Sequence, residues 1–579
     1  MKKSLNLSYK LLIERPENHH VKVVIKGDFP SDARELEFFM PSWSPGSYLI
    51  REYSRHVRAL MAFAENGERL NVEQTHKGKW KVYKNFPGVN NKTPKSFELV
   101  YEVYCHELTV RTSHVDASHA FIHGPSVFMG VVDYQMPNPT LEVRFPQAWS
   151  KISTGLKDIS SQREVFLYSA ADYDAFIDAP IEIGCHETDG FQVQGIDHEL
   201  AFYGDFLPHN YQIKKDIKTI VETVVQTMKE IPYEKYTFIT HMVPGKYGGL
   251  EHLNSTALHF SPLNFNDRKE YLHWLALVAH EYFHTWNVKR IRPIELGPFD
   301  YLNEAMTKLL WLAEGLTSFM DELFVLRSGL CSMEEYFEMQ KDNWNRLIST
   351  PGRFFHSLDE SSFNAWIKLY RPDENSANSS VSYYLKGGIV FFFLNVLMRE
   401  KNSSVDDLLD MLWKRYKDDP SKGVTAEEVY AMVEKLAGPE VRDEFKHYNQ
   451  STEEIDFNKF SNRMGLEIVW DQPKAPYLGA QATFNGDRVL IKSVVLDSPA
   501  MKAGLNADDE VLAINGLRIL RGEWNDLSKI LLTDKSYKLT VSRLNKLVDI
   551  EITPGLAPKV IKELKIVDRQ RAAQILGIK

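Results

Sequence analysis

Residues 270–284 read EYLHWLALVAHEYFH, and this stretch decides how the middle of the chain folds. It is rich in good helix formers and contains neither glycine nor proline, so it predicts one continuous helix. Two histidines, His280 and His284, stand four residues apart at its end. Because side chains at positions i and i+4 share one face of a helix, both imidazoles can point at one place.

Together with Glu281 these histidines form an H-E-x-x-H motif, which is typical of zinc-binding helices. A catalytic zinc ion needs one further protein ligand and an open position for water. Glu281 is placed to reach that water and to act as a general base. A chance pentapeptide is the competing explanation, so the prediction depends on finding a third ligand.

Candidates for the third ligand are Glu295, Glu304, Glu314 and Glu322. Glu314 lies in a second apolar helical pattern, WLAEGLTSF over 311–319, which could pack against the first. A semi-buried carboxylate in such a setting needs a partner to offset its desolvation, and zinc would be one. Taken alone, Glu314 could also be a surface carboxylate. Glu304 and Glu322 are more easily interpreted as solvated.

The 579 residues are too many for one core, so we expect several domains and a multidomain α+β fold class. Residues 1–188 are predicted to form a β-rich N-terminal domain and residues 189–458 a catalytic domain of mixed β and then mostly α structure. Residues 459–557 are predicted to form a small β module, followed by a C-terminal tail at 558–579.

The hydrophobic patterns place individual elements within these domains. Strands are predicted at 21–25, 97–104, 141–145, 200–203, 236–243 and 489–495, and helices near 211–230, 268–290, 302–328, 380–400 and 404–416.

Two stretches, HEYFHTWNVKRIRP at 280–293 and WLAEGLTS at 311–318, resemble the glycyl aminopeptidase family. These are gluzincins related to aminopeptidase N that carry a C-terminal PDZ domain. Residues 40–53 (MPSWSPGSYLIREY) and 172–184 (DYDAFIDAPIEIG) are similar to that family's front-domain motifs, so the resemblance extends over nearly the whole chain. It implies a thermolysin-like catalytic domain, one Zn²⁺ ion and Glu314 as the third ligand.

The spacing from His284 to Glu314 is longer than is usual in aminopeptidase N, so residues 291–301 are expected to loop out.

The segment GGLEH at 248–252 resembles the Gly-x-Met-Glu-Asn strand of aminopeptidase N. This implies that Glu251 binds the free α-amine of a substrate, and that Gly248 and Gly249 let the substrate backbone approach. The alternative is a Gly-Gly turn that ends a strand with an exposed glutamate. His252 stands where the relatives have asparagine, so the resemblance assigns it no role.

The segment YYLKG at 383–387 resembles the relatives' Tyr-x-Lys-Gly, which implies that Tyr384 stabilises the oxyanion of the tetrahedral intermediate. The alternative is that Tyr383 and Tyr384 are core aromatics at a helix start. Asn287 is a candidate to hold a zinc ligand in place from behind, although it could equally cap the helix or face solvent.

Three segments near the C-terminus, YLGA at 477–480, DSPAMKAGL at 497–505 and DDEVLAING at 508–516, resemble a PDZ domain of bacterial proteases. The resemblance implies capture of an extended peptide at a sheet edge, with the amides of Leu478, Gly479 and Ala480 facing its C-terminal carboxylate. The alternative is a module that only packs on the catalytic domain or mediates dimerisation.

These residues predict a zinc-dependent aminopeptidase acting on peptide substrates, and the family implies a preference for small N-terminal residues, Gly and Ala. One alternative is a zinc endopeptidase that recruits substrates through the PDZ domain. The other is a peptide-binding scaffold with a vestigial metal site.

Composition excludes several other classes of function. The net charge is −9 and no Lys/Arg run indicates nucleic-acid binding. The most apolar stretch, 389–398, is too short to span a bilayer, and the first residues lack the apolar core of a secretory signal. Cys105, Cys185 and Cys331 are far apart, which argues against disulfides and Cys-zinc sites. We therefore expect no membrane partner and a cytoplasmic location, and oligomerisation is left open.

Overall fold

The front of the chain is built from strands whose alternate side chains enter one core. In β3 (His20–Asp28), Val21, Val23 and Ile25 are fully buried, and the residues between them include the more accessible Lys22. This period of two is what a sheet with one buried face requires. The strand pairs antiparallel with β8 (Ser96–Tyr104) on one side and with β2 (Leu7–Leu12) on the other.

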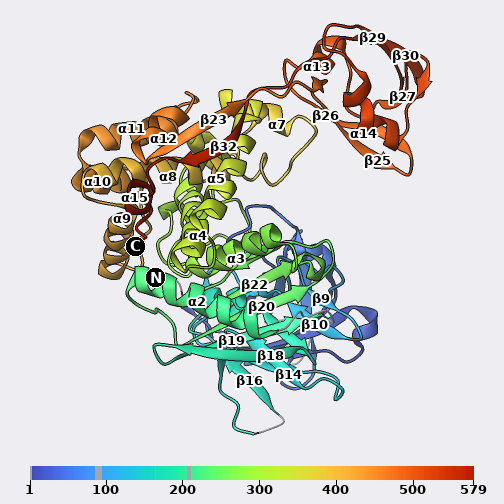
Figure 1. Cartoon of the computed structure of the whole chain (residues 1–579). Helices are drawn as coiled ribbons and strands as arrows, with labels where there is room; N and C mark the ends of the chain where they lie inside the picture. Colours follow the sequence, from blue (N-terminus) through green and yellow to red (C-terminus); the bar gives the residue numbers. More distant parts are fainter. Residues whose placement is uncertain (1–2, 85–93, 163–164, 205–209, 579) are drawn as a thin grey trace. The chain divides into compact units, whose positions relative to one another are not determined.

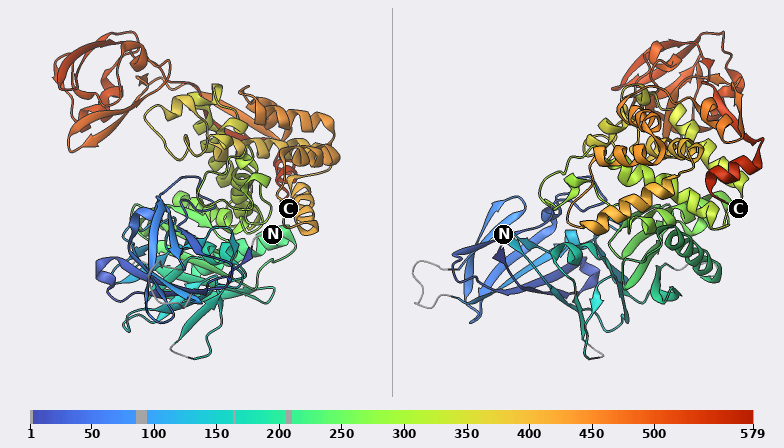
Figure 2. Two further views of the ribbon diagram at one scale, coloured as in Figure 1. Left: turned by 180° about the vertical axis from the view of Figure 1, so that it is seen from behind. Right: turned by 90° about the vertical axis from the view of Figure 1, so that its left-hand side faces the viewer.

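These strands belong to an eleven-stranded sheet of the described chain, and the long ones run side by side in the right-hand view of Figure 2. Its other members are β4 (Glu35–Phe39), β5 (Val57–Ala64), β6 (Arg69–His76), β7 (Lys79–Tyr83), β11 (Gly130–Val131), β13 (Thr140–Arg144), β15 (Lys157–Asp158) and β16 (Phe166–Ser169). A four-stranded sheet, β14 (Lys151–Thr154), β17 (Ile181–Gly184), β10 (His119–Ile122) and β9 (His114–Val115), and the short helix α1 (Tyr173–Asp178) complete this domain.

A five-stranded sheet follows, with the spatial order β18 (Glu187–Val193), β19 (Ile196–Tyr203), β20 (Lys235–Met242), β22 (Ser255–Phe260) and β21 (Gly248–Glu251). The middle three strands are parallel, and β21 runs antiparallel to β22 at the edge. Helices α2 (Asn210–Met228) and α3 (Arg268–Phe283) pack against each other and against strands of this sheet (Figure 1).

The computed structural model describes residues 3–84, 94–162, 165–204 and 210–578. The chain divides into two compact units, the first comprising residues 1–305 and 413–423 and the second residues 306–412 and 424–579. The three sheets above lie in the first unit.

The second unit begins with a π-helical turn, η6 (Trp311–Gly315), which continues directly into α4 (Leu316–Arg327). The apolar α8 (Tyr383–Glu400) packs on both. The other helices of this unit are α5 (Met333–Ile348), α6 (Leu358–Phe363), α7 (Ser376–Ser379), α10 (Ala426–Ala437), α11 (Pro439–Gln450) and α12 (Phe457–Arg463). Helix α9 (Val405–Asp418) begins in this unit, and its residues 413–418 belong to the first.

A β module is inserted between two paired strands of this unit. The chain leaves the helices along β23 (Leu466–Asp471) and returns antiparallel to it along β32 (Val560–Ile566), as Figure 1 shows. The module's sheet consists of β25 (Ala480–Asn485), β26 (Arg488–Val494), β27 (Glu510–Ile514), β28 (Leu517–Arg518), β29 (Tyr537–Arg543) and β30 (Lys546–Ile552), and its helices are α13 (Pro499–Ala503) and α14 (Arg521–Ile530). After β32, α15 (Arg569–Leu576) packs on α8, where Asn395 donates to the Ile575 carbonyl.

The predicted fold class, a β-rich front, a mixed and then helical middle and a C-terminal β module, is confirmed. Two of the predicted helices are shorter than the sequence pattern indicates. The helix expected over 302–328 begins only at Trp311, because Tyr301 is buried in the front-domain core and its hydroxyl bonds to Asp174. The helix expected over 268–290 ends at Phe283, and a series of turns follows.

Among the described residues, no helix combines the length and the apolar character needed to cross a bilayer. The three cysteines are free thiols, with Cys105 and Cys331 buried and Cys185 exposed.

Candidate active site

Helix α3 begins and ends at residues that fix its position. At its start the Asp267 carboxylate accepts hydrogen bonds from the amides of Lys269 and Glu270, at 2.9 and 3.1 Å, which satisfies two of the helix's unpaired donors. Its last turn carries His280 and Glu281, and His284 follows as the C-cap. All three side chains are buried, so they face the protein interior and not bulk solvent.

The tautomer of His284 follows from its hydrogen bond. Its Nδ1 lies 2.5 Å from the main-chain oxygen of Asn287, and a carbonyl oxygen can only accept, so Nδ1 carries the proton. The lone pair is therefore on Nε2, which is the arrangement that metal-binding histidines adopt. The His280 and His284 rings lie 4.6 Å apart between centroids. This pair of imidazoles fits a zinc ion, which prefers nitrogen donors of this kind.

Strand β21 passes so close to Glu281 that a side chain on it would displace the carboxylate. A Cβ atom added at Gly249 would lie 2.2 Å from Glu281 Oε1, so Glu281 could not keep its present position. The strand thereby carries Glu251 to the same place, and ligand atoms of Glu251, Glu281 and His284 all lie within 4.8 Å of one another. Gly248, with φ of +146°, is the first residue of this strand, and Glu251 is its last.

The Glu251 carboxylate is buried, with only 3% of the residue exposed, and its Oε1 accepts no hydrogen bond from the described residues. A desolvated carboxylate oxygen without a donor is costly, so the site favours a ligand that brings a donor or a positive charge. This contradicts the exposed-glutamate alternative for the Gly-Gly-Leu-Glu segment.

A loop of the front domain covers Glu251. Gly46 adopts a left-handed conformation with φ of +85°, and a Cβ atom there would lie 2.3 Å from Glu251 Oε1. Beside this contact is a cavity of about 20 Å³. Its lining comprises Trp43, Pro45, Gly46, Tyr48, Glu251, Val288, Lys289, Arg292, Leu296 and Phe299.

The two residues after Glu251, His252 and Leu253, are anchored by the carboxylate of Asp178, which the sequence did not indicate as a site residue. Asp178 accepts hydrogen bonds from the Leu253 amide at 2.7 Å and from Lys289 at 2.6 Å, and lies 3.4 Å from His252 Nδ1. Burial opposes ionisation of Asp178, but Lys289 and His252 outweigh it and lower the pKa of Asp178 well below its ordinary value. The resemblance at 172–184 contained this residue, but only the tertiary structure shows its partners.

In the second unit, Glu314 lies in the π-helical turn and is 1% exposed. Such turns place one extra residue in a helix and are frequent at functional sites. The turn itself approaches α8 closely, since a Cβ atom at Gly315, its last residue, would lie 2.8 Å from the Gly387 Cα. This contact between two glycines lets the turn that carries Glu314 lie near the first turn of α8, which carries Tyr384.

Tyr384 is the second residue of α8, whose first turn is capped by the Ser382 side chain. Its hydroxyl lies 3.3 Å from that of Tyr370. Burial, followed by the Glu314 carboxylate, raises the pKa of Tyr384 well above its ordinary value. The phenol is therefore protonated at neutral pH and can donate a hydrogen bond. Tyr383 is fully buried beside it, with the two rings stacked at 4.8 Å.

The interpretation of Glu322 as a solvated residue is wrong. Its carboxylate accepts hydrogen bonds from Gln340 and Asn343, at 2.6 and 3.0 Å. Burial, followed by the charge of Asp321, raises the pKa of Glu322 to about 8. Glu304 is exposed, as expected.

In the C-terminal module, Leu478 and Gly479 connect β24 (Pro476–Tyr477) to β25, which begins at Ala480 and is an edge strand of the sheet. The Gly479 carbonyl accepts from the Val495 amide and the Leu478 carbonyl from the Ala500 amide, both at 2.8 Å. A Cβ atom at Gly479 would lie 2.2 Å from that of Ser498, so this position requires glycine. The loop is thereby fixed against the start of α13.

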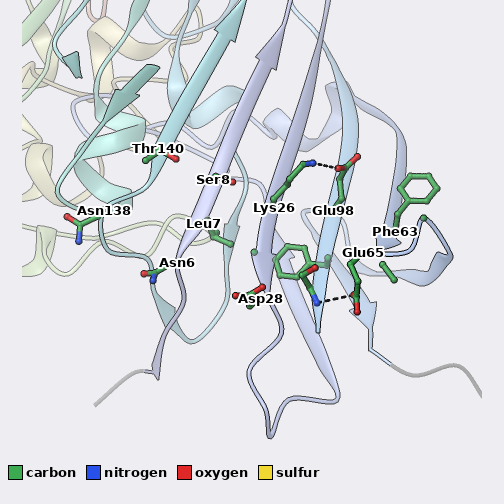
Figure 3. A pocket seen from close by; sticks show the side chains of 15 residues that line it. Asn6, Leu7, Ser8, Lys26, Asp28, Phe63, Glu65, Glu98, Asn138 and Thr140 are labelled. Carbon is green, nitrogen blue, oxygen red and sulfur yellow. Dashed lines mark hydrogen bonds and ion pairs between the residues drawn. The ribbon is translucent and has the colours of Figure 1, made fainter. Parts of the chain in front are cut away.

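A larger hollow of about 1020 Å³ lies on the front domain (Figure 3). Two of its charged groups, Lys26 and Glu98, are paired at 2.7 Å, and the Glu65 carboxylate accepts from the Ser96 amide. Its described lining contains no histidine.

The predicted residues thus fall into three places. The first unit brings together His280, Glu281, His284 and Glu251, with Gly248 and Gly249 on the adjoining strand and Asn287 behind His284. The second unit holds Glu314 and Tyr384 near each other. The loop of Leu478, Gly479 and Ala480 lies in the C-terminal module.

Comparison with known proteins relates the chain to three families. The profile of the M61 glycyl aminopeptidase family matches residues 273–390, that of the peptidase M61 N-terminal domain residues 8–185, and that of the PDZ domain residues 476–553. No curated protein sequence matches the chain.

Two solved structures resemble the chain to different degrees. An aminopeptidase N family protein from Idiomarina loihiensis superposes with a TM-score of 0.91 at 27% identity, covering 98% of this chain and 100% of that one. An M1 zinc metallopeptidase from Deinococcus radiodurans superposes with a TM-score of 0.52 at 14% identity, covering 78% of this chain and 95% of that one. The second likeness shows a shared fold alone.

The Asp178 anchor generates a prediction about stability. Replacing Asp178 with asparagine leaves the buried ammonium of Lys289 without its counter-charge. We therefore expect the free energy of unfolding of the first unit to fall by ~3 kcal/mol. Denaturant unfolding at neutral pH measures this. The control is Asp32→Asn, whose partner Lys3 is exposed, and no measurable change is expected there.

The same pair should show a defined pH dependence. Because the pKa of Asp178 is lowered in the folded state, its stabilisation is complete above the unfolded carboxyl value of about 3.9 and is lost as the pH falls below it. The difference between wild type and Asp178→Asn should therefore narrow below about pH 4. A constant difference down to pH 2 would contradict the ionised anchor.

Proposed function

Because the chain belongs to the M61 glycyl aminopeptidase family, it is a peptidase, and we propose that it is a zinc-dependent aminopeptidase that removes small N-terminal residues from peptides. The observation that carries the proposal is the buried Glu251 carboxylate, whose Oε1 accepts no hydrogen bond from the described residues and lies beside Glu281 and His284. A free α-ammonium group would supply both the charge and the donors that this oxygen lacks.

We propose that His280, His284 and Glu314 hold one zinc ion. The two histidines present the donors that zinc prefers, and His284 Nε2 is left with its lone pair by the bond to Asn287. Glu314 lies in the second unit, but the family profile over 273–390 includes it together with α3 and Tyr384 in one family domain. Its burial in a π-helical turn supports the assignment, since π turns are frequent at functional sites.

The chain's own side chains divide the remaining work of hydrolysis. Zinc, when bound, polarises a carbonyl group and makes water more acidic. Glu281 takes a proton from the attacking water and passes it to the leaving amine. Glu251 holds the substrate's ammonium group and so places the first peptide bond, not a later one, at Glu281. Tyr384 remains protonated and donates a hydrogen bond to the developing oxyanion.

The proposed preference for glycine and alanine rests on space. The cavity beside Glu251 has about 20 Å³, little more than one water molecule occupies, and the front-domain loop at Gly46 closes over the carboxylate. Trp43 and Tyr48, which are fully buried, form rigid walls. A substrate whose ammonium reaches Glu251 therefore has little room for a large first side chain.

The PDZ domain favours a second candidate, an endopeptidase whose substrates are recruited by their C-termini. Its edge strand β25 is available for pairing with an extended peptide, and Leu478, Gly479 and Ala480 precede or begin it. We propose that this strand binds peptide C-termini in either case. Glu251 favours the aminopeptidase, because an internal peptide bond brings no charged amine to it.

Replacing Glu281 with glutamine removes the general base while keeping the side-chain volume. We expect kcat for Gly- and Ala-arylamides to fall by about 10²–10⁴-fold, since that is the range of general-base catalysis. Release of the arylamine measures it, and a chelator should abolish wild-type activity until Zn²⁺ is restored. Glu304→Gln is the control, because Glu304 is exposed, and it should retain full activity. Activity of Glu281→Gln close to wild type would refute the mechanism.

N-acetylation separates the two candidate functions. An acetylated substrate has no ammonium group for Glu251, so we expect kcat/KM to drop by at least tenfold. A tenfold change corresponds to ~1.4 kcal/mol, and a hydrogen bond to a charged group contributes more than that. In Glu251→Gln the substrate with a free amine should lose most of its advantage in kcat/KM. The ratio of kcat/KM for the free-amine substrate to that for the acetylated substrate should then approach one. Equal cleavage of both substrates by the wild type would support the endopeptidase.

The proposed role of Tyr384 concerns catalysis and not binding. Tyr384→Phe removes the hydroxyl, and we expect kcat to fall by about 10²–10³-fold with little change in KM. The matched control is Tyr383→Phe, which removes the hydroxyl of the stacked neighbour and should leave kcat unchanged. If the two variants lose activity equally, Tyr384 is not the oxyanion donor.

A further inference from the structure

The first unit contains a second group of metal-ligating side chains that the proposed hydrolysis does not use. His114 in β9, Asp116 in the turn that follows and His119 in β10 all belong to one β-hairpin. Each can offer one ligand atom such that the three atoms lie within 4.8 Å of one another. None of these residues forms part of the site around Glu281.

The hydrogen bond of His114 leaves a lone pair facing a carboxylate. Its Nδ1 lies 2.6 Å from the His106 carbonyl oxygen, which can only accept, so Nδ1 carries the proton. Its Nε2 lies 3.3 Å from Asp116 Oδ2. When the imidazole is neutral, His114 Nε2 and Asp116 Oδ2 are both acceptors and repel each other. A cation bound between the two atoms removes this repulsion.

His119 is held in the same way by a buried carboxylate. Its Nδ1 lies 2.7 Å from Oε1 of Glu182, which is fully buried and whose other oxygen lies 2.9 Å from His241 Nε2. The second nitrogen of His119, Nε2, is buried and has no hydrogen-bond partner among the described residues. The ring itself is fixed by stacking on Tyr203, with centroids 3.5 Å apart.

Asp116 completes the arrangement. Its Oδ1 accepts hydrogen bonds from the amides of Ser118 and His119, at 2.7 and 3.2 Å, so the carboxylate is fixed in the turn. This leaves Oδ2 toward His114. The Asp116 side chain is 37% exposed, which provides a path for an ion from solvent and room for water as a further ligand.

We propose that His114 Nε2, His119 Nε2 and Asp116 Oδ2 bind a divalent first-row transition-metal ion. Two imidazoles and one carboxylate form a borderline donor set that suits Zn²⁺ and its neighbours and does not suit Mg²⁺ or Ca²⁺. The His106 carbonyl and Glu182 are the outer partners that hold the two rings, an arrangement that recurs behind histidine ligands of metals.

The position of this site assigns it a structural role. The hairpin belongs to the four-stranded sheet of the front domain, whereas His241 lies in β20 of the catalytic sheet. Glu182 bonds to both His119 and His241. An ion at the hairpin therefore fixes His119 and, through Glu182, the contact between the two sheets of the first unit.

The test uses the full chain with His280→Ala and His284→Ala, so that the proposed catalytic site cannot retain metal. After removal of metal, Zn²⁺ is titrated and counted by elemental analysis and calorimetry. We expect one equivalent per chain, together with a rise in the unfolding temperature, because an ion that binds the folded state stabilises it. This result does not depend on whether the chain is an aminopeptidase.

Variants in the same background locate the ion. Asp116→Asn keeps the Oδ1 acceptor but removes the charge, and we expect zinc affinity to fall at least tenfold. Glu182→Gln, which alters the support of His119, should reduce it by about 10–100-fold. The matched control is His106→Ala, which removes a neighbouring imidazole but leaves the carbonyl that holds His114, and its affinity should be unchanged.

If Asp116→Asn does not fold, His114→Phe replaces it, because phenylalanine keeps the ring volume and lacks both nitrogens. Absence of a zinc equivalent in the double-alanine chain would overturn the proposal. So would unchanged affinity in Asp116→Asn, or a loss in His106→Ala as large as that in Asp116→Asn, which would indicate adventitious binding to surface histidines.

Discussion

The buried carboxylates of Glu251 and Glu281 each lie directly against the main chain of a glycine, and the site in the first unit depends on these two close contacts. Gly249 approaches Glu281 and Gly46 approaches Glu251 to distances that any Cβ atom would prevent. Because both carboxylates are buried, their charges are not shielded by water and act strongly on whatever occupies the site. A larger residue at either glycine would force the facing carboxylate, Glu281 or Glu251, out of its present position.

The front domain is therefore part of the site and not only an attachment to it. Its loop covers Glu251 through Gly46, and its Asp178 binds Lys289 and the main chain just after His252. The two Asp178 contacts are polar, short and largely removed from water, so they fix a position more strictly than apolar packing would. The same domain also supplies Glu182, which joins His119 of the β9–β10 hairpin to His241 of the five-stranded sheet.

A common device orients the histidines at both proposed metal sites of the first unit. His284 and His114 each place Nδ1 against a main-chain carbonyl, and His119 places it against a carboxylate. The nitrogen that carries the proton is thereby decided by the acceptor that faces Nδ1, a main-chain carbonyl or a carboxylate, and Nε2 is left with its lone pair. In the second unit a different device operates, since the contact between Gly315 and Gly387 sets the distance from the turn of Glu314 to the first turn of α8.

The sequence by itself determined the helix of His280 and His284, the front-domain strands around 21–25, 97–104 and 141–145, the PDZ module and the family, because hydrophobic periodicity and short motifs are local properties of the chain. It also indicated Glu251 and Tyr384, through their resemblance to motifs of relatives. The tertiary structure alone decided where the helices at 268–290 and 302–328 end and begin, since the chain between them enters the front-domain core at Tyr301. It alone showed Asp178, Gly46 and the group of His114, Asp116 and His119. These depend on contacts between segments distant in sequence, and no local pattern records which carboxylate will lie beside which histidine.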